Sequence, residues 1–356
     1  MPNRRTTFSK FIIEEQRRRT TPDRELTALL NDIQTACKFI ASATSRGKLS
    51  KPVPGEPDPP GLPVKSISAL ADEIMLRESE WGGQLCGVVS AAGAEPCAIP
   101  AIYPRGPYLL AFNALEGSSN LDIGLAAGTI FSVLRAPEGV TEATGVDFLQ
   151  PGTKQVAAGF ALYGSTSTIV ITLGAGVHGF TLDREIGAYT LTDPDMRIEH
   201  DARRVAIDST NQRFWEPPVQ QYVEECVQGG AGSRLGDFDL RWADSLAVET
   251  YRLLVRGGVF IFPLDTRDPA KSGRLRLLHE ANPIAMIVEQ AQGSASTGRA
   301  RILDLSPAGL DDRVPGIFGA KDEVERLVRY HQAFDRGEGV AFEAPLFNAR
   351  SLFRAG

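Results

Sequence analysis

A run of short apolar segments between residues 128 and 193 constrains the fold of this chain most. The segments read "GTIFSVLR", "QVAAGFALYG", "TSTIVITLG", "GVHGFTLD" and "GAYTLT", with glycines at the breaks between them. Such close spacing with turn residues is typical of successive antiparallel strands. Before this run, residues 25–47 and 66–82 place apolar side chains at helical spacing. We therefore expect one half of the molecule to carry helices laid on a mostly antiparallel sheet.

The pattern changes after about residue 195. Two segments, "PPVQQYVEECVQGG" and "SLAVETYRLLVRGG", are helical in pattern and each is closed by a glycine pair, whereas "GVFIFP" reads as a strand. A further helix is expected to begin near Pro283. Alternating strands and helices predict a second α/β layer. We expect domains at 1–195 and 196–332, followed by an extended tail at 333–356.

Composition limits the partners and the compartment. The 356 residues are 42% hydrophobic and 23% charged, with a net charge of −6, which fits a soluble globular chain and argues against nucleic acid or an anionic membrane. No apolar run approaches the ~18 residues of a membrane span. The four cysteines show no C-x-x-C spacing, so a reducing, cytoplasmic location is expected.

The segment "FNALEGSSNLDI" is a candidate phosphate site. Behind a short buried strand, Glu116 is followed by Gly117, Ser118, Ser119 and Asn120. Small residues let backbone N–H groups approach an anion closely, and the two serine hydroxyls can donate to phosphate oxygens. Gly, Ser and Asn are also common in ordinary turns, so the motif alone is compatible with either a phosphate site or a simple turn.

Two arginine-bearing segments could supply further anion contacts. In "GRLRLLHEANP", strand alternation would put Arg274 and Arg276 on one face, ahead of His279 and Glu280. In "DFDLRWADSL", Arg241 precedes a helix. The competing interpretations are a solvated strand face for the first pair, a surface ion pair for Arg241, and a packed, hydrogen-bonded side chain for His279.

Together these segments resemble the class I fructose-1,6-bisphosphatases. The resemblance rests on "NALEGSSNLDIGLAAGTIF", "DFLQPGTKQVAAGFALYGSTST", "GRLRLLHEANPIAMIVEQAQG" and "RILDLSP", and it runs from the "SKFIIEEQRR" helix to about residue 330. The ending "PLFNARSLFR" is similar to the version found with bacterial Calvin-cycle operons. The resemblance implies an α/β (α+β) fold, a layered α/β/α/β/α sandwich, and a homotetramer.

The resemblance also implies a ligand, a phosphorylated sugar, and its site. The matching positions are Gly117, Ser118, Ser119, Asn120, Asn211, Arg241, Arg274 and Arg276. Arg241 matches an arginine that reaches into the neighbouring subunit's site. Three substrate positions depart from the family pattern, because Asp208 replaces an asparagine, and Trp242 and Phe262 replace tyrosines. Two hydroxyl donors to phosphate are thereby lost.

The implied metal site departs further. The family holds Mg²⁺ with carboxylates at positions where this chain has Ala91, Ala92, Asn113, Glu116 and Glu280, so that only Glu280 is unchanged. Leu62 and Ser68 also stand where the catalytic loop has acids. Mg²⁺ prefers anionic oxygen ligands, so we expect any Mg²⁺ at Glu116 and Glu280 to be weakly held. With the arginines retained, the site should become more positive.

Three hypotheses about function follow. In the first, the protein binds a phosphorylated sugar and has lost ordinary Mg²⁺-dependent hydrolysis, or has been redirected to metal-independent elimination, isomerisation or transfer. Glu116, Glu280 or His279 would then be the catalytic acid or base. In the second, it is a weak or altered fructose-1,6-bisphosphatase that uses one metal through Glu116 and Glu280, with Glu95 and Asp122 assisting. In the third, it is a non-catalytic regulatory subunit.

Overall fold

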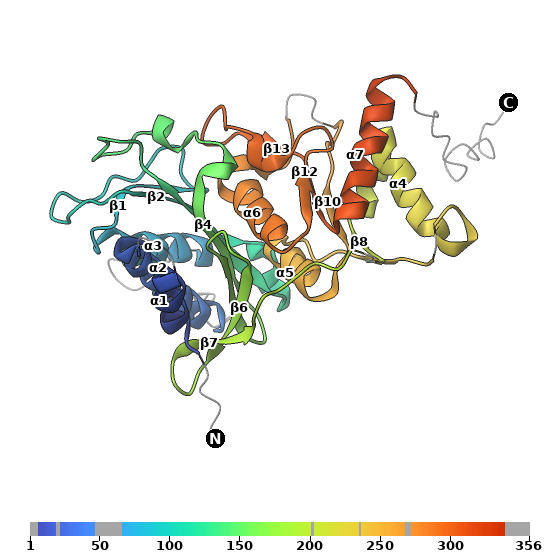
Figure 1. Ribbon diagram of the computed structural model, residues 1–356. Helices are drawn as coiled ribbons and strands as arrows, with labels where there is room; N and C mark the ends of the chain where they lie inside the picture. The colour runs from blue at the N-terminus through green and yellow to red at the C-terminus, as the bar shows by residue number, and fades with distance from the viewer. Residues whose placement is uncertain are drawn as a thin grey trace, which may run out of the picture.

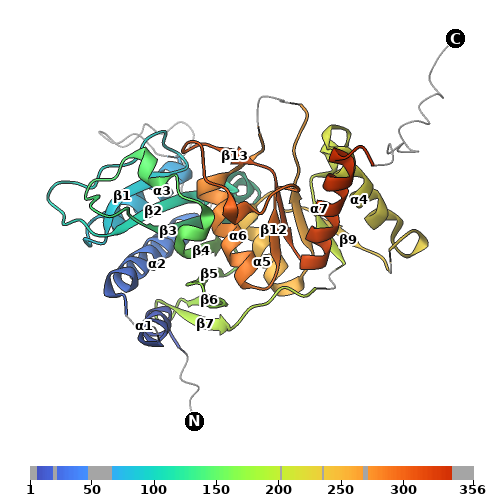
Figure 2. The ribbon, with the colours of Figure 1, turned by 45° about the horizontal axis from the view of Figure 1, so that its top comes forward.

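The computed structural model describes residues 6–18, 22–46, 66–200, 203–234, 236–267 and 272–338. Within these ranges the elements form five layers, helix, sheet, helix, sheet and helix (Figures 1 and 2). The predicted layered sandwich is confirmed. Leu62, the proline-rich segment 52–63 and the tail from residue 339 lie outside the described residues.

The first layer consists of the N-terminal helices, α1 (Phe8–Arg18), α2 (Arg24–Thr44) and α3 (Ile67–Glu80). Asp23 caps α2 by accepting a hydrogen bond from the Leu26 N–H at 2.9 Å, and Ser66 caps α3. The buried side of α2, which includes Leu29, Ile33 and Ile40, belongs to the same apolar core as the facing strands. The amphipathic pattern of these segments is therefore satisfied by packing on a sheet.

The second layer is a seven-stranded sheet in sequence order. Its strands are β1 (Leu85–Ser90), β2 (Tyr108–Glu116), β3 (Ala127–Arg135), β4 (Gln155–Tyr163), β5 (Ser167–Thr172), β6 (Val177–Asp183) and β7 (Ala188–Asp193). Only the β1–β2 pair is parallel; the other five pairs are antiparallel. The central strands are buried on both faces, which explains why their sequences are continuously apolar instead of alternating. The predicted antiparallel sheet is confirmed.

The middle layer is formed by α5 (Leu246–Arg256) and α6 (Asn282–Gln290). Every residue of α6 from Asn282 to Val288 is buried, as expected for a helix that is apolar on all sides. Ile284 and Ile287 share one core with Phe160 of the seven-stranded sheet and with Phe260 from the other sheet. Both sheets are therefore packed against the same two helices.

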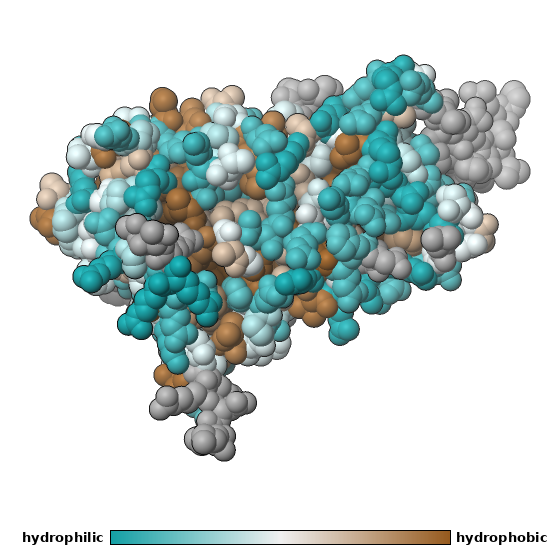
Figure 3. Space-filling view, in the orientation of Figure 1, coloured by the Kyte–Doolittle hydropathy of each residue, from teal (hydrophilic) through white to brown (hydrophobic). Residues whose placement is uncertain are grey.

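The second sheet has five short strands in the order β12-β14-β10-β8-β9. They are β8 (Arg204–Ala206), β9 (Asp239–Arg241), β10 (Val259–Phe262), β12 (Ser294–Ser296) and β14 (Gly316–Gly319). Its outer side is covered by α4 (Pro217–Gln228) and α7 (Lys321–Asp335) (Figure 2). Hydrophilic side chains cover most of the face over these two helices (Figure 3). A two-stranded sheet, β11 (Leu275–Arg276) with β13 (Arg313–Val314), completes this half.

No helix among the described residues is long and apolar enough to cross a bilayer.

Candidate functional site

The Gly-Ser-Ser turn lies where β2 ends beside the middle layer. Gly117 has a φ of 68°, and a Cβ atom placed there would lie 2.8 Å from the Cβ of Ser245. A glycine is therefore required both by the left-handed backbone and by the close approach of the segment that opens α5. Ser118 begins a short 3-10 helix, Ser118–Ile123, and Ser119 is exposed.

Glu116 is bound to the N-terminus of α5. Its carboxylate accepts hydrogen bonds from Ser245 Oγ at 2.7 Å, from the Leu246 N–H at 2.9 Å and from the Ala247 N–H at 3.2 Å. Desolvation raises the pKa of Glu116 to about 7, while these donors act in the opposite direction. Glu116 therefore closes the first turn of α5, where unpaired N–H groups favour a carboxylate.

Asn113 lies three residues before Glu116 on β2, and its side chain is hydrogen-bonded to Glu280. The Asn113 Nδ2 donates to Glu280 Oε1 at 2.9 Å, although the two residues are 167 positions apart in the chain. The other oxygen, Glu280 Oε2, accepts from the backbone N–H of Arg276 at 2.8 Å, and the Arg276 guanidinium lies 3.6 Å from Oε1. Both oxygens of Glu280 are therefore engaged by donors from the protein.

The prediction that Arg274 and Arg276 share one strand face is wrong. The strand is limited to Leu275–Arg276, and a π-helical turn, Leu277–Ala281, follows at once. Arg276 Nε donates to Asp311 Oδ1 at 2.7 Å. Arg274 is exposed, and its guanidinium carbon lies 5.4 Å from the centre of the Phe262 ring.

A pocket of about 300 Å³ joins the turn to these residues. It is lined by Glu116, Gly117, Ser118, Ser119, Asp244, Leu246, Phe262, Arg274, Leu275 and Glu280. Six of the residues proposed from the sequence thus come together around one cavity. The expected positive character is not found among the described residues, of which three acidic side chains and one arginine line the pocket. The pairing of Glu116 and Glu280 with donors offsets part of that negative charge.

Sequence reasoning missed Asp244, which lines the pocket, and Ser245, which binds Glu116, although both carry a recognisable sequence signal. Asp244 has a φ of 48°, a conformation that aspartate tolerates better than most residues. Ser245, which follows it, is the N-cap of α5. The Asp-Ser pair before an apolar helical segment in "WADSLAVET" is a helix-start signature, so the docking of this helix end could have been proposed.

Five of the residues proposed for the site do not line this pocket. They are Asn120, Asn211, Arg241, Arg276 and His279. Asn120 is buried and donates to the carbonyls of Ala126 and Ala243, which stabilises the turn itself. Asn211 donates to Asp208, and Arg241 lies exposed on β9 at the edge of the second sheet.

His279 is buried inside the π-helical turn. It is 2% exposed, and neither ring nitrogen has a hydrogen-bond partner among the described residues. Burial, with a smaller contribution from the Arg276 charge, lowers the pKa of His279 to about 4. The imidazole is thus neutral at physiological pH, and it does not line the pocket.

The positions at which the family resemblance implies further carboxylates are occupied by Ala91 and Ala92 in this chain. The Ala91 N–H donates to the Phe112 carbonyl at 2.8 Å, and the Ala92 N–H donates to Ser90 Oγ at 3.0 Å. Glu95 is exposed. Across the described part of the chain, no group of three or more His, Cys, Asp or Glu side chains could hold a metal ion. With Glu116 and Glu280 already engaged, the side chains here do not fit a two-metal Mg²⁺ centre.

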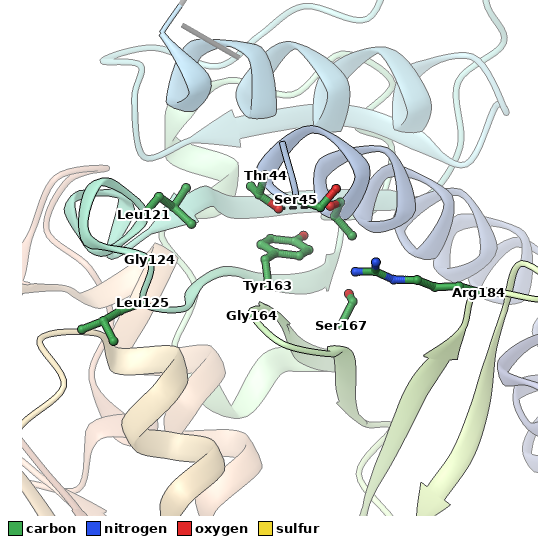
Figure 4. A pocket seen from close by; sticks show the side chains of 10 residues that line it. Thr44, Ser45, Leu121, Gly124, Leu125, Tyr163, Gly164, Ser167 and Arg184 are labelled. Atoms are coloured by element: carbon green, nitrogen blue, oxygen red, sulfur yellow. Dashed lines mark hydrogen bonds between the residues drawn. The ribbon is translucent and has the colours of Figure 1, made fainter. Parts of the chain in front are cut away.

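A second pocket, of about 220 Å³, is lined in part by Leu121, Gly124 and Leu125, which follow the same turn in the chain (Figure 4). Leu121 and Leu125 face the end of α2 across it, and Arg184 extends toward it from the β6–β7 connection. Its hydroxyl groups are used within the fold. For example, the Tyr163 hydroxyl lies 2.6 Å from Thr129 Oγ1 and the Ser167 hydroxyl 2.7 Å from that of Tyr189. We therefore centre the candidate site on the first pocket.

Two family profiles match this chain. The profile described as "Fructose-1-6-bisphosphatase, N-terminal domain" matches residues 6–194, and "Fructose-1-6-bisphosphatase, C-terminal domain" matches residues 198–332. A protein of Methylacidiphilum infernorum (isolate V4), "Fructose-1,6-bisphosphatase class 1", is 51% identical over 355 residues, 99% of each chain. The chain belongs to the class 1 fructose-1,6-bisphosphatase family.

Other members of the fructose-1,6-bisphosphatase family agree with this assignment. The "Fructose-1,6-bisphosphatase class 1" of Hydrogenophilus thermoluteolus is 48% identical over 351 residues, 98% of this chain and 97% of its own. The crystal structure of Leishmania major fructose-1,6-bisphosphatase in holo form superposes with a TM-score of 0.82 at 30% identity, covering 92% of this chain and 99% of that one. The family recognised from the Gly-Ser-Ser segment is thus confirmed over nearly the whole length.

Proposed function

We propose that this fructose-1,6-bisphosphatase family member binds a phosphorylated sugar in the pocket behind its Gly-Ser-Ser turn. We further propose that Mg²⁺-dependent phosphate hydrolysis is lost or redirected to another sugar-phosphate reaction. The observation that carries the second part is the hydrogen bond from Asn113 to Glu280. An amide donor occupies a position where a hydrolytic centre of this family needs a carboxylate acceptor. The neighbouring Glu116 already accepts hydrogen bonds from the N-terminus of α5.

The groups available for a metal-independent reaction are few. Glu116 and Glu280 line the pocket, and a carboxyl group whose pKa lies near 7, as burial gives Glu116, can act as an acid or a base at neutral pH. Elimination, isomerisation and transfer each need such a group beside the sugar. His279 is a weaker candidate because it is buried and does not line the pocket.

Ordinary hydrolysis of fructose 1,6-bisphosphate is the second candidate function. Two relatives at about half identity over nearly the whole chain are named fructose-1,6-bisphosphatase class 1. Their names favour an enzyme over a non-catalytic subunit. In this alternative a single metal would use Glu116 and Glu280, with Glu95 and Asp122 assisting, and phosphate release would depend on it.

The first experiment measures inorganic phosphate released from fructose 1,6-bisphosphate with Mg²⁺, with Mn²⁺ and with a chelator, beside the Methylacidiphilum infernorum relative. We expect background release from folded protein in all three conditions. Release that depends on metal and matches the relative would reject the loss of hydrolysis. Phosphorus NMR of the same mixtures would reveal a product formed without release of phosphate.

Binding is measured separately by titration calorimetry with fructose 1,6-bisphosphate and fructose 6-phosphate. Arg274→Ala should weaken binding about tenfold or more, because it removes the one cationic side chain that lines the pocket among the described residues. Arg184→Ala is the matched control, since this exposed arginine lines the second pocket. Equal affinity in both variants and the wild type would place the ligand elsewhere.

Assembly and location complete the proposal. We infer a cytoplasmic homotetramer in which Arg241 serves the site of a neighbouring subunit. The exposure of Arg241 on the edge strand β9 supports this role. Light scattering after size exclusion should give a tetramer's mass, and Arg241→Ala should weaken sugar-phosphate binding without changing that mass.

A further inference from the structure

We propose that hydrogen-bond donors of the protein have taken the place of divalent cations in this site, so that its fold is complete without metal. The inference deepens the proposed function, and it concerns the chemistry that keeps two facing carboxylates in the pocket wall. Glu116 and Glu280 both line the same pocket, so two carboxylates share one cavity wall. Two such groups need compensating positive charge or donors.

The compensation comes from three separate elements. At Glu116 it comes from the first turn of α5, whose Leu246 and Ala247 N–H groups and Ser245 hydroxyl all point at the carboxylate. A helix N-terminus carries a partial positive charge, equivalent to about half an elementary charge. Three donors on one carboxylate leave it poorly placed to ligate a cation as well.

At Glu280 the compensation comes from β2 and from the strand that precedes the π-helical turn. Asn113 supplies Nδ2 at 2.9 Å and Arg276 supplies its backbone N–H at 2.8 Å. An aspartate at position 113 would be nearly the same size, but it would set a carboxylate oxygen against Glu280 Oε1. Two ionised carboxylates at that separation repel each other unless a cation lies between them.

This reasoning assigns a specific role to the Asn113 amide, which is to hold Glu280 in place without a cation. It predicts that wild-type stability is indifferent to divalent cations. It also predicts that Asn113→Asp creates a need for them, because the new carboxylate joins Glu280 and Glu116 in one cluster. Asn113→Ala loses the same hydrogen bond but adds no charge, so it is the matched control.

The test is thermal unfolding at pH 8 of the full chain and both variants, in chelator and in millimolar Mn²⁺, without sugar. The wild-type midpoint should not move with Mn²⁺. Asn113→Asp should melt about 5 °C or more below the wild type in chelator and regain most of that loss in Mn²⁺. Asn113→Ala should be destabilised without recovery.

A wild-type midpoint that rises with Mn²⁺ would overturn the inference, and so would an Asn113→Asp variant that Mn²⁺ does not rescue. If that variant fails to fold, calorimetric titration of the wild type with Mn²⁺ decides the matter. Heat of binding at a 1:1 or higher ratio overturns the inference, and its absence supports it. Because no sugar is present, these outcomes are independent of whether the pocket binds a phosphorylated sugar.

Discussion

The contacts of Glu116 give a structural role to a side chain that the sequence predicts to be catalytic or metal-binding. Its carboxylate lies at the end of β2 and accepts three hydrogen bonds from residues Ser245 to Ala247. The sequence predicts that Glu116 is a catalytic or metal-binding acid, because it stands beside a phosphate-type turn. Its partners could not be predicted, since they lie 129 to 131 positions away in the chain. Its structural contribution can be measured directly.

Glu116→Ala should lower the free energy of unfolding by about 3–5 kcal/mol, because it leaves buried N–H and O–H donors of the α5 N-terminus unpaired. Glu116→Gln keeps one acceptor oxygen but turns an amide donor toward other donors, so it should cost about 1–2 kcal/mol. Chemical denaturation at pH 7 measures both. Equal, small losses would show that water satisfies this helix end.

The burial of His279 predicts how the stability of the folded protein depends on pH. Its pKa falls from the usual 6.5 to about 4 in the folded protein because the imidazole is buried. The unfolded chain therefore binds this proton more readily than the folded one. The contribution of the neutral imidazole is complete above about pH 6.5, and about 3 kcal/mol is lost as the pH falls toward 4.

His279→Gln removes this titration. The difference in unfolding free energy between the wild type and the variant should therefore shrink, or reverse, between pH 7.5 and pH 4.5. Denaturation curves at those two pH values provide the measurement. Equal losses of unfolding free energy in the wild type and the variant would mean that groups other than His279 make the protein sensitive to acid.

Among the elements, regular strands and amphipathic helices were predictable because their periodicity is local. The segment "RLRLLHEA" was not, because its alternation resembles a strand, yet the chain forms a π-helical turn from Leu277. A π-turn is defined by backbone hydrogen bonds to the fifth residue along, for which side-chain order gives no signal. The turn buries His279, and Arg274 lies outside the short strand Leu275–Arg276 that precedes it.

The contact between β3 and α5 provides a prediction at this scale. A Cβ at Gly128 would lie 2.6 Å from the Ala161 carbonyl oxygen and 2.6 Å from the Ala247 Cβ. Gly128→Ala should therefore push α5 from the sheet and cost about 2–3 kcal/mol. Gly309→Ala is the control, because nothing lies within 4 Å of its added Cβ, and it should stay within about 0.5 kcal/mol of the wild type. Similar losses in both would contradict tight β3–α5 packing.

For the whole molecule, the family resemblance predicted the layered sandwich, and local patterns alone predicted only two sheets with helices. The shared middle layer depends on tertiary packing. Division of the chain at residue 195, with a separate tail from 333, remains a prediction. Because α6 packs in one core with Phe160 of the first sheet and Phe260 of the second, the two halves are not energetically separate.

We therefore expect a single cooperative transition in calorimetric thermal unfolding of the full chain. Ile287→Ala, which opens a cavity in the shared core, should lower that one midpoint and leave the transition undivided. Two resolved transitions in the wild type, or a second one that appears in the variant, would show that each sheet folds with its own helices alone.

The hydrogen bond between Asn113 and Glu280 also has an evolutionary consequence. If the site has exchanged a ligand carboxylate for an amide as proposed, its fold needs no ion, and other ligand positions can change without loss of stability. The reverse path is then no longer a sequence of harmless single steps. Restoring Asp at position 113 alone sets it against Glu280, so that variant depends on a divalent cation for its stability. A return to metal-dependent hydrolysis would therefore pass through a protein whose folding is tied to the supply of that ion.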